Sequence, residues 1–253
     1  METKFYLPQN IFSRILLSEM EDKSELEFEF VPSSLIAKRI SNEKDTVGLI
    51  PTMDLLSNKD LFISSEIGIS FNALLSNAYI YFKEEQETIE ELFLRGDVTV
   101  NEVILSKLLF KEFYDVEVKT TLLHREVSDF KDNILIIGDE NYEKELFLNG
   151  LSFAEEIIEL ISAPYVNFIL AAESEETLKK FSLNYKNSLT KAHAENFDDL
   201  FPEFPQTSLD FLSVNIQHLV FDLEEQDLEG IKQLLQMPYY HGIIKEITDV
   251  KFV

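Results

Sequence analysis

Short apolar runs alternate with longer amphipathic ones along most of the chain. Residues 26–31 read Leu-Glu-Phe-Glu-Phe-Val, and this strict alternation predicts a half-buried strand with Glu27 and Glu29 facing water. A helical segment at 34–40 follows, and a short apolar strand is predicted at 47–50. A strand, a helix and a strand in succession are typical of an α/β protein with mostly parallel sheets.

The same alternation continues toward the C-terminus. Further helices are predicted at residues 51–57, 101–113, 139–147 and 152–161, and further strands at 77–82, 134–137 and 165–171. Ser152 and Glu155 form a capping-box pattern at the start of one of these helices. After residue 173 the pattern is helical throughout, and it ends in a helix at 227–237 and a short tail.

Two of the predicted strands, 77–82 and 165–171, are too long and too apolar for the edge of a sheet. If both cross between two lobes, the segment between them forms a small sheet of its own. We therefore expect a first lobe from residues 1–82 and 172–253, and a second lobe from residues 83–171. Ligands of α/β proteins bind at the carboxyl ends of strands and at domain interfaces, so the cleft between the lobes is the predicted ligand site.

The amino-acid composition excludes several classes of function. The chain has 22 Lys and Arg against 47 Asp and Glu, a formal net charge of −25, which repels nucleic-acid phosphates. Because there is no Cys, disulfides, thiolate metal sites and thiol nucleophiles are excluded. No run approaches the roughly 18 apolar residues of a membrane-spanning helix, and the N-terminal residues lack the basic and apolar regions of an export signal. We expect a cytoplasmic protein with neither a nucleic-acid nor a membrane partner.

Several motifs of known enzyme classes are absent from the sequence. There is no Gly-rich phosphate loop, no Gly-x-Ser-x-Gly elbow and no His-Glu-x-x-His. The four histidines, His124, His193, His218 and His241, show no paired spacing that suits a metal ion. We therefore predict neither a metal nor a cofactor.

Several segments resemble one known family. Residues 47–56 read Val-Gly-Leu-Ile-Pro-Thr-Met-Asp-Leu-Leu, and with Ile-Gly-Ile-Ser at 67–70 they resemble the front of the MqnA family, the chorismate dehydratases of the futalosine route to menaquinone. The family's order and spacing also recur at residues 134–140, 153–156, 163–166 and 222–230. The resemblance implies a two-lobed α/β fold like that of type II periplasmic binding proteins, in which each lobe is a mixed sheet flanked by helices and two strands cross over.

The resemblance also implies a reaction, the dehydration of chorismate to 3-[(1-carboxyvinyl)oxy]benzoate without cofactor or metal. A site for this small-molecule dicarboxylate needs helix starts, hydroxyl groups or Arg side chains as donors. Four positions of the chain match substrate-binding positions of the family, namely Asn10, Ser70, Asn77 and Asn101.

The chain departs from the family's substrate-loop motifs. The family's Ser-Arg-Gly-Pro-x-x-Ser loop falls on Ser70-Phe-Asn-Ala-Leu-Leu-Ser-Asn77, where only Ser70 is kept. Asn72 stands at the Arg position and Asn77 at the second Ser, and an amide still donates hydrogen bonds but is no hydroxyl. The family's Ser-x-Thr-Ser falls on Val98-Thr-Val-Asn101, which loses most of the hydroxyl donors.

Each candidate also has a purely structural interpretation. Asn10 and Asn101 directly precede predicted helices, where Asn is a common N-cap. Ser70 and Asn77 also fit a surface loop ahead of a strand. Asp139, directly after the strand at 134–137, is either the N-cap of the next helix or, if burial raises its pKa, a proton acceptor in catalysis.

One cation near the N-terminus, Arg14, is placed one turn inside the first predicted helix. It either faces a ligand carboxylate in the cleft or is a solvated side chain. Two functions therefore stay open: a lyase that closes its lobes around a dicarboxylate, and a non-catalytic module that binds or senses a small anion on the same scaffold. The patterns predict no oligomeric state.

Overall fold

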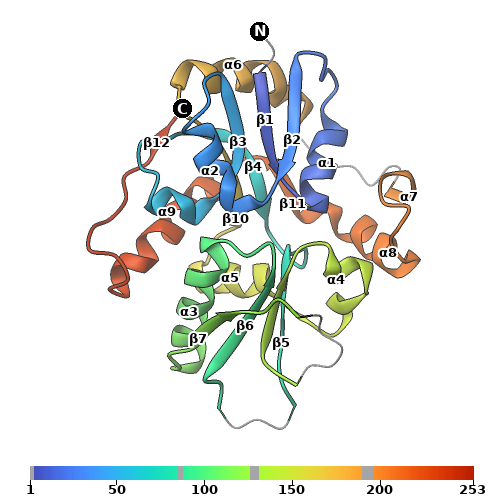
Figure 1. The fold of residues 1–253 in the computed structure, drawn as a ribbon, viewed down its shortest axis with the longest axis vertical. Coiled ribbons are helices and arrows are strands. Elements are labelled where there is room, and N and C mark those ends of the chain that lie inside the picture. Colours follow the sequence, from blue (N-terminus) through green and yellow to red (C-terminus); the bar gives the residue numbers. More distant parts are fainter. Residues whose placement is uncertain (1–2, 85–87, 126–130, 190–196) are drawn as a thin grey trace.

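The first lobe, uppermost in Figure 1, is built on a seven-stranded mixed sheet. The structure, a computed structural model, describes residues 3–84, 88–125, 131–189 and 197–253. The strands of this sheet are β1 (Thr3–Pro8), β2 (Leu26–Val31), β3 (Thr46–Pro51), β4 (Phe62–Phe71), β10 (Tyr165–Ala172), β11 (Leu219–Asp222) and β12 (Lys251–Phe252). They follow the order β11-β4-β10-β3-β1-β2, with β12 beside β4.

The helices of the first lobe lie around this sheet. They are α1 (Ile11–Glu19), α2 (Ser33–Ile40), α6 (Glu175–Tyr185), α7 (Phe197–Leu200), α8 (Gln206–Asn215) and α9 (Glu225–Tyr240), together with the 3-10 helices η1 (Thr52–Leu56), η3 (Lys186–Ser188) and η4 (Ile216–His218). Strands β1, β2 and β3 pair in parallel, whereas β10 is antiparallel to both β3 and β4. The sheet is therefore mixed.

The second lobe, below the first in Figure 1, has a five-stranded sheet in the order β7-β6-β8-β5-β9. Its strands are β5 (Ala78–Tyr81), β6 (Glu91–Gly96), β7 (Lys119–Leu122), β8 (Ile134–Ile137) and β9 (Leu151–Ser152). Its helices are α3 (Val100–Tyr114), α4 (Glu140–Glu143) and α5 (Phe153–Ile161), with the 3-10 helix η2 (Leu146–Leu148). Helices α3 and α5 lie on one side of this sheet in Figure 1, and α4 lies on the other.

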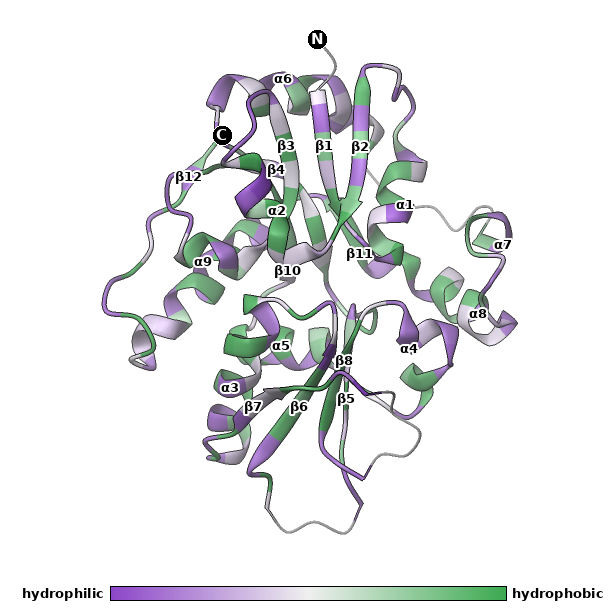
Figure 2. Ribbon diagram, in the orientation of Figure 1, coloured by the Kyte–Doolittle hydropathy of each residue, from purple (hydrophilic) through white to green (hydrophobic). Residues whose placement is uncertain are grey.

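Strands in the middle of each sheet are largely apolar, although β10 also carries the buried Asn167. Every residue of β3, β8 and β10 is buried, and β8 lies among the hydrophobic strands of the second lobe in Figure 2. Largely apolar strands are typical of sheets covered by helices on both faces. The edge strand β2 departs from the predicted alternation, because Phe28 is 46% exposed. Glu29 on the same strand forms an ion pair with Lys4 at 2.8 Å.

The two passages between the lobes differ from the prediction. Strand β5 pairs within the sheet of the second lobe, and β10 pairs within the sheet of the first, so the predicted crossing strands each belong to the opposite lobe. The chain passes between the lobes after Phe71 and again before Tyr165, two residues that are partners in the β4–β10 pairing. The apolar sequences of both strands indicated that each lies in the middle of a sheet, but they did not indicate which sheet each strand joins.

Other predicted elements need correction. The C-terminal region is not wholly helical, because β11 and β12 both pair with β4. The predicted helix at 51–57 is the 3-10 helix η1. The sheets were predicted to be mostly parallel, but both contain antiparallel as well as parallel pairs of strands. A four-residue apolar strand such as β11 cannot be told from a buried helical segment by periodicity alone.

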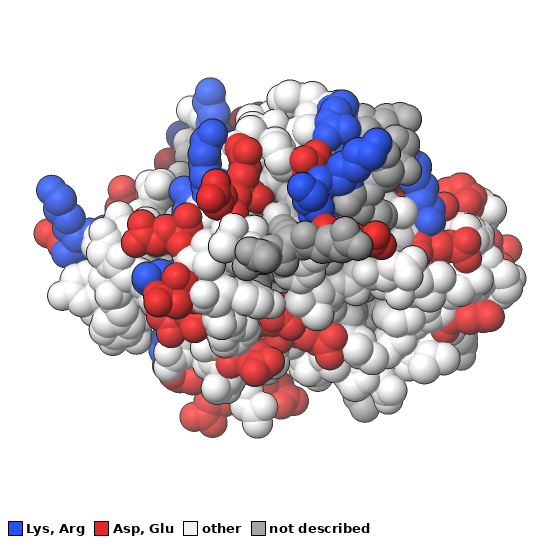
Figure 3. Space-filling view, turned by 90° about the horizontal axis from the view of Figure 1, so that it is seen from below, with Lys and Arg blue, Asp and Glu red and all other residues white. Residues whose placement is uncertain are grey.

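Acidic residues are spread over the surface. Figure 3, which looks at the molecule from the free end of the second lobe, shows them scattered over that face, with the Lys and Arg side chains in separate groups. Within the described residues, no helix combines the length and the apolarity that crossing a membrane requires.

Candidate functional site

We call the region where the two lobes meet the lobe junction. Here the starts of helices in the first lobe face the ends of strands and the starts of helices in the second lobe. Three side chains of the second lobe accept hydrogen bonds there from backbone N–H groups of the first: Asp139 from Ile11, Asp97 from Ser33, and Asn101 from Met53. The first N–H groups of a helix have no partner within the helix, so each must find one elsewhere. The lobes therefore meet through polar contacts at three separate helix starts.

Asp139 follows β8 and Gly138, as the sequence predicted, but its side chain does not cap its own helix. Its Oδ1 atom accepts a hydrogen bond of 2.9 Å from the backbone N–H of Ile11, at the start of α1 in the other lobe. Burial raises the pKa of Asp139 to about 6, although the Ile11 N–H and the charge of Arg14 both act to lower it. A carboxylate with such a pKa exchanges protons readily near neutral pH.

Asn10 is the N-cap of α1, which confirms its structural interpretation. Its Oδ1 atom accepts a hydrogen bond of 2.9 Å from the backbone N–H of Ser13. The other side-chain atom, Nδ2, is buried and has no hydrogen-bond partner among the described residues, and the same holds for the hydroxyl of Ser13. The N-cap therefore uses only the Oδ1 atom of the Asn10 side chain, and Nδ2 takes no part in it.

Asn77 lies in the passage between the lobes and is only 5% exposed. Its backbone oxygen accepts a hydrogen bond of 2.7 Å from the N–H of Gly138, which places Asn77 beside Asp139. Its side-chain Oδ1 atom is buried without a partner in the described chain. Asn10, Asn77 and Asp139 are therefore brought together, and we call these three residues the Asp139 cluster.

Ser76, next to Asn77, has a structural role. Its hydroxyl donates to the backbone oxygen of Ala78 at 2.6 Å and accepts from the N–H of Ala154 at 3.1 Å. It thus holds the start of α5 against the passage between the lobes.

Asp97 is a junction residue that sequence reasoning missed. Both of its carboxylate oxygens accept from the N–H of Ser33 at 3.1 Å, and the Ser33 hydroxyl donates to it as well. Burial raises its pKa against the lowering effect of these bonds. A signal was present in the sequence: Gly96-Asp97 and Gly138-Asp139 stand at the carboxyl ends of the neighbouring parallel strands β6 and β8, and both glycines have a positive φ.

Asn101 connects the lobes rather than capping its helix. Its Oδ1 atom accepts from the N–H of Met53 at 2.9 Å, and its Nδ2 atom donates to the backbone and side-chain oxygens of Asn167, both at 2.8 Å. The N-cap of α3 is Thr99, which forms a capping box with Glu102. The predicted N-cap was therefore displaced by two residues, and the amide of Asn101 is fully engaged.

Ser70 lies apart from the Asp139 cluster in its contacts. Its hydroxyl donates to Oδ1 of Asp227 at 2.5 Å, while Oδ2 of Asp227 accepts from the N–H of Glu224 at the start of α9. Asn72, at the position of the family's Arg, has its Oδ1 atom 2.9 Å from Nδ1 of His218. Both side chains thus have partners within the first lobe.

A pair of buried acids, also missed, lies at the start of η1 and of α3. Asp54 is 7% exposed and Glu102 is 2% exposed. Burial and, to a smaller extent, the charge of Glu102 together raise the pKa of Asp54 to about 7. Burial also raises the pKa of Glu102, against the hydrogen bonds that it accepts from Thr99. Buried carboxyl groups therefore lie on both the first-lobe side and the second-lobe side of the lobe junction.

Arg14, for which facing a ligand carboxylate in the cleft was one of two interpretations, is engaged elsewhere. Arg14 donates to Glu203 at 2.8 Å and to the backbone oxygen of Leu200, and it lies over the ring of Phe201. Arg95, on β6, pairs with Glu140 at 2.8 Å. Both arginines beside the Asp139 cluster are therefore neutralised by glutamates.

Buried aromatic rings lie next to the polar groups of the junction. The ring of Phe12 contacts Phe71 at 4.9 Å between centroids and Tyr142 at 6.2 Å, and Phe71 contacts Tyr165 at 6.4 Å. Tyr142 donates its hydroxyl to the backbone oxygen of Ser76 at 2.8 Å. These rings give the Asp139 cluster apolar walls, which explains why burial dominates the pKa of Asp139.

The described residues contain no group of three or more His, Asp or Glu side chains placed to hold a metal ion. His218 contacts Asn72, and Nε2 of His241 lies 3.3 Å from Glu112. His193 lies outside the described residues.

No family model and no curated protein matches the sequence. Solved structures do resemble the fold. Protein AF1704 from Archaeoglobus fulgidus superposes with a TM-score of 0.69 at 16% identity, over 95% of this chain and 98% of its own. The periplasmic aliphatic sulphonate-binding protein SsuA from Escherichia coli gives 0.62 at 10% identity, over 98% and 90%.

A third similar structure is the zinc-bound ligand-binding component of an ABC-type import system from Staphylococcus aureus, with a TM-score of 0.63 at 13% identity over 99% of this chain and 95% of its own. At these identities the likeness shows the fold alone. The predicted two-lobed fold, like that of type II periplasmic binding proteins, is confirmed. The chain thus has the fold of solute-binding proteins.

Proposed function

We propose that this chain binds a small polar organic acid between its lobes, at the Asp139 cluster. The observation that carries the proposal is the pair of buried, unpartnered amide atoms, Nδ2 of Asn10 and Oδ1 of Asn77, beside Asp139. A buried polar atom without a partner costs about 1–3 kcal/mol. A ligand that satisfies both atoms recovers this free energy, so the cluster favours an occupant.

The two unpartnered atoms define the chemistry of the ligand. Nδ2 of Asn10 donates and suits a carboxylate or carbonyl oxygen, whereas Oδ1 of Asn77 accepts and suits a hydroxyl or amino group. A hydroxy acid carries both groups. Because Asp97 and Asp139 already cap two helix starts, a second negative charge on the ligand meets repulsion unless Asp139 is protonated.

The fold supports a ligand between the lobes. Two of the similar structures are, by their descriptions, a sulphonate-binding protein and the ligand-binding component of an importer. In our proposal the lobes part to admit the ligand, and the hydrogen bonds from Ile11, Ser33 and Met53 to the second lobe form again on closure.

A second candidate function is the lyase reaction of the MqnA family. One observation favours it: a carboxylate with a pKa near 6, that of Asp139, lies in the same cluster. In this proposal Asp139 takes the ring proton of chorismate and returns it to the departing hydroxyl, so that water leaves and the ring becomes aromatic. Chorismate, a hydroxylated dicarboxylate, also offers an acceptor to Asn10 and a donor to Asn77.

Binding is tested by thermal unfolding and calorimetric titration with chorismate, 3-hydroxybenzoate and the neutral 3-hydroxybenzamide. We expect at least one acid to stabilise the protein, since a ligand at 100 times its Kd adds about 2.7 kcal/mol. The variant Asn10→Ser keeps an N-cap oxygen but loses Nδ2, and it should weaken binding, as should Asn77→Ala. Asn184→Ala, on the exposed face of α6, is the matched control. No stabilisation by either acid would refute the proposal.

The lyase is tested separately, by incubation with chorismate and chromatographic detection of the enolpyruvyl benzoate. If the protein is a lyase, product forms and Asp139→Asn abolishes turnover while chorismate still shifts the melting temperature. Binding without product identifies the non-catalytic binding protein instead.

A further inference from the structure

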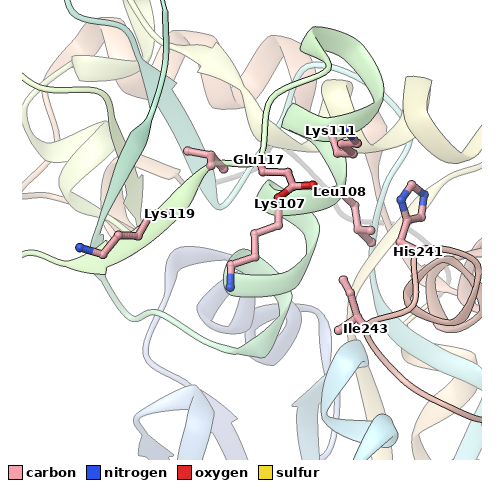
Figure 4. Close-up of a pocket in the computed structure, with 8 residues that line it drawn as sticks. Lys107, Leu108, Lys111, Glu117, Lys119, His241 and Ile243 are labelled. Atoms are coloured by element: carbon pink, nitrogen blue, oxygen red, sulfur yellow. The ribbon is translucent and has the colours of Figure 1, made fainter.

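A cavity of about 450 Å³ opens on the outer side of α3, and it shares no residue with the Asp139 cluster. Four of the side chains that line it are cationic or become so on protonation. Lys107 and Lys111 come from α3, Lys119 from β7, and His241 directly follows α9 (Figure 4).

This set of cations is unusual for so acidic a chain. The whole sequence has 22 Lys and Arg against 47 Asp and Glu, yet three lysines and one acid, Glu117, line this cavity. Three of the basic groups have acidic neighbours: Lys111 pairs with Asp115, Lys119 with Glu91, and His241 with Glu112. These three acidic partners are not among the residues that line the cavity. They therefore position the basic side chains at the cavity wall and leave its interior open.

Lys107 differs from the other three. It is exposed on α3 and makes no ion pair with any described residue. In the view of Figure 4 its ammonium group lies between the side chains of Lys119 and Ile243. Its three N–H donors are therefore available to an anion.

The other side of the cavity is apolar. Leu108 and Val118 are buried, and Ile243 is 44% exposed. The segment that carries Ile243 is held in place, since the N–H groups of Ile243 and Ile244 both donate to the backbone oxygen of Pro238, at 2.8 and 3.2 Å. Ile243 thus presents a fixed apolar surface opposite the lysines.

The cavity also spans the two lobes. Lys107 and Lys119 belong to the second lobe, while His241 and Ile243 follow α9 of the first. An occupant that contacts both walls therefore bridges the lobes at a place remote in sequence from the Asp139 cluster.

We propose that this cavity is a second binding site, for a small organic anion that joins a phosphate or carboxylate group to an apolar body. Lys107 binds the anionic group, with Lys111 and Lys119 adding positive potential, and Ile243 with Leu108 packs against the apolar body. Neither the ion pair with Lys107 nor the apolar contact with Ile243 is sufficient for tight binding by itself. An exposed ion pair contributes little free energy, and a half-exposed apolar side chain offers a limited contact area.

The test is a calorimetric titration of the protein with phenyl phosphate, inorganic phosphate and phenol. Phenyl phosphate should bind saturably and more tightly than either part. Lys107→Gln should weaken its binding about fivefold, the upper range for one exposed ion pair, whereas Lys180→Gln, the same change on the exposed face of α6, should not.

The apolar wall has its own matched pair of variants. Ile243→Ser should weaken phenyl phosphate but leave inorganic phosphate unchanged, and Ile247→Ser, at a residue that is 43% exposed in the same segment, should affect neither. Circular dichroism verifies that each variant is folded. The proposal is overturned if phenyl phosphate does not saturate at about 10 mM. It is equally overturned if Lys107→Gln and Lys180→Gln behave alike, or if only Asn10→Ser weakens the binding, since the ligand would then lie at the Asp139 cluster.

Discussion

The Oδ1 atom of Asp139 lies 2.9 Å from the backbone nitrogen of Ile11, so a carboxylate of one lobe caps a helix of the other. Asp97 does the same at Ser33. Helix starts attract anions, since their free N–H groups point at the ligand and the helix dipole favours negative charge. In this chain the second lobe supplies the anions itself. Two helix starts on which the scaffold would hold a charged ligand are therefore already occupied when the lobes are in contact.

Asn101 should contribute strongly to stability. Asn101→Ala removes the acceptor for the buried N–H of Met53 and the donor to the backbone oxygen of Asn167. The side-chain Oδ1 atom of Asn167, in contrast, keeps its hydrogen bond from Tyr165. We expect a loss of about 3 kcal/mol in the free energy of unfolding, measured by urea denaturation. Asn184→Ala, an amide removed from an exposed helical position, should change it by less than about 0.5 kcal/mol. Similar losses in the two variants would contradict a connecting role for Asn101.

Stability should fall as the pH rises, because of Asp54. Its pKa is raised from the ordinary value of 3.8 to about 7 in the folded protein, so the folded state holds the proton more tightly than the unfolded state. The free energy of unfolding therefore decreases as the pH rises from about 4 to about 7, and by linkage the decrease amounts to about 2–4 kcal/mol. Denaturation at a series of pH values measures it.

The control for this pH effect is a pair of variants with the same chemical change. Asp54→Asn removes this buried titration, so it should make the pH dependence shallower and stabilise the protein at pH values above 7. The slope that remains comes from other buried acids with a raised pKa, such as Asp139. Asp249→Asn changes an exposed carboxylate and should leave the slope as it is. An unchanged slope in Asp54→Asn would show that other groups cause the effect.

Most of the fold could be predicted from local pattern, and the errors have a common origin. The strand at 134–137 and the helices at 34–40 and 152–161 were found because their periodicity or apolar character is strong. Strand β11 was missed because four residues carry no clear period, and it is defined by pairing with the distant β4. The crossing strands were assigned to the wrong sheets for the same reason, since sheet membership depends on long-range partners.

The candidate site was predicted in part. Asn10, Asn77 and Asp139 do come together, while Ser70 and Asn101 are bonded to Asp227 and Asn167. The roles of Asn101 and Asp139 depend on how the lobes meet, whereas that of Ser70 depends on the long-range placement of α9 beside β4 within the first lobe. The repeated Gly-Asp after β6 and β8 was the sequence signal for Asp97, but an isolated pair of residues does not reveal that the two strands are neighbours.

The two glycines of this repeat should differ in their tolerance of a side chain. Both have a positive φ, 102° for Gly96 and 106° for Gly138. A Cβ atom at Gly96 would lie 1.8 Å from the backbone oxygen of Ile137, whereas at Gly138 nothing lies within 4 Å. Gly138→Ala should therefore cost only the backbone strain of about 1–3 kcal/mol. Gly96→Ala should cost clearly more or prevent folding, because β6 and β8 must separate. Equal midpoints in urea would contradict this.

The caps at Ile11 and Ser33 should act independently, and together they should hold the lobes in contact. Asp97→Ala should speed amide exchange in the first turn of α2 by about tenfold or more, the equivalent of one hydrogen bond to a charged group, and Asp139→Ala should do so at α1. Neither should affect the other helix, and Asp115→Ala, an exposed carboxylate at the end of α3, should affect neither. In the double variant we expect a larger radius of gyration by small-angle X-ray scattering, since the second lobe then keeps only Asn101 among the three contacts described at helix starts. If the double variant scatters like the parent protein, the two aspartates do not hold the lobes together, and packing of the aromatic rings at the junction must do so instead.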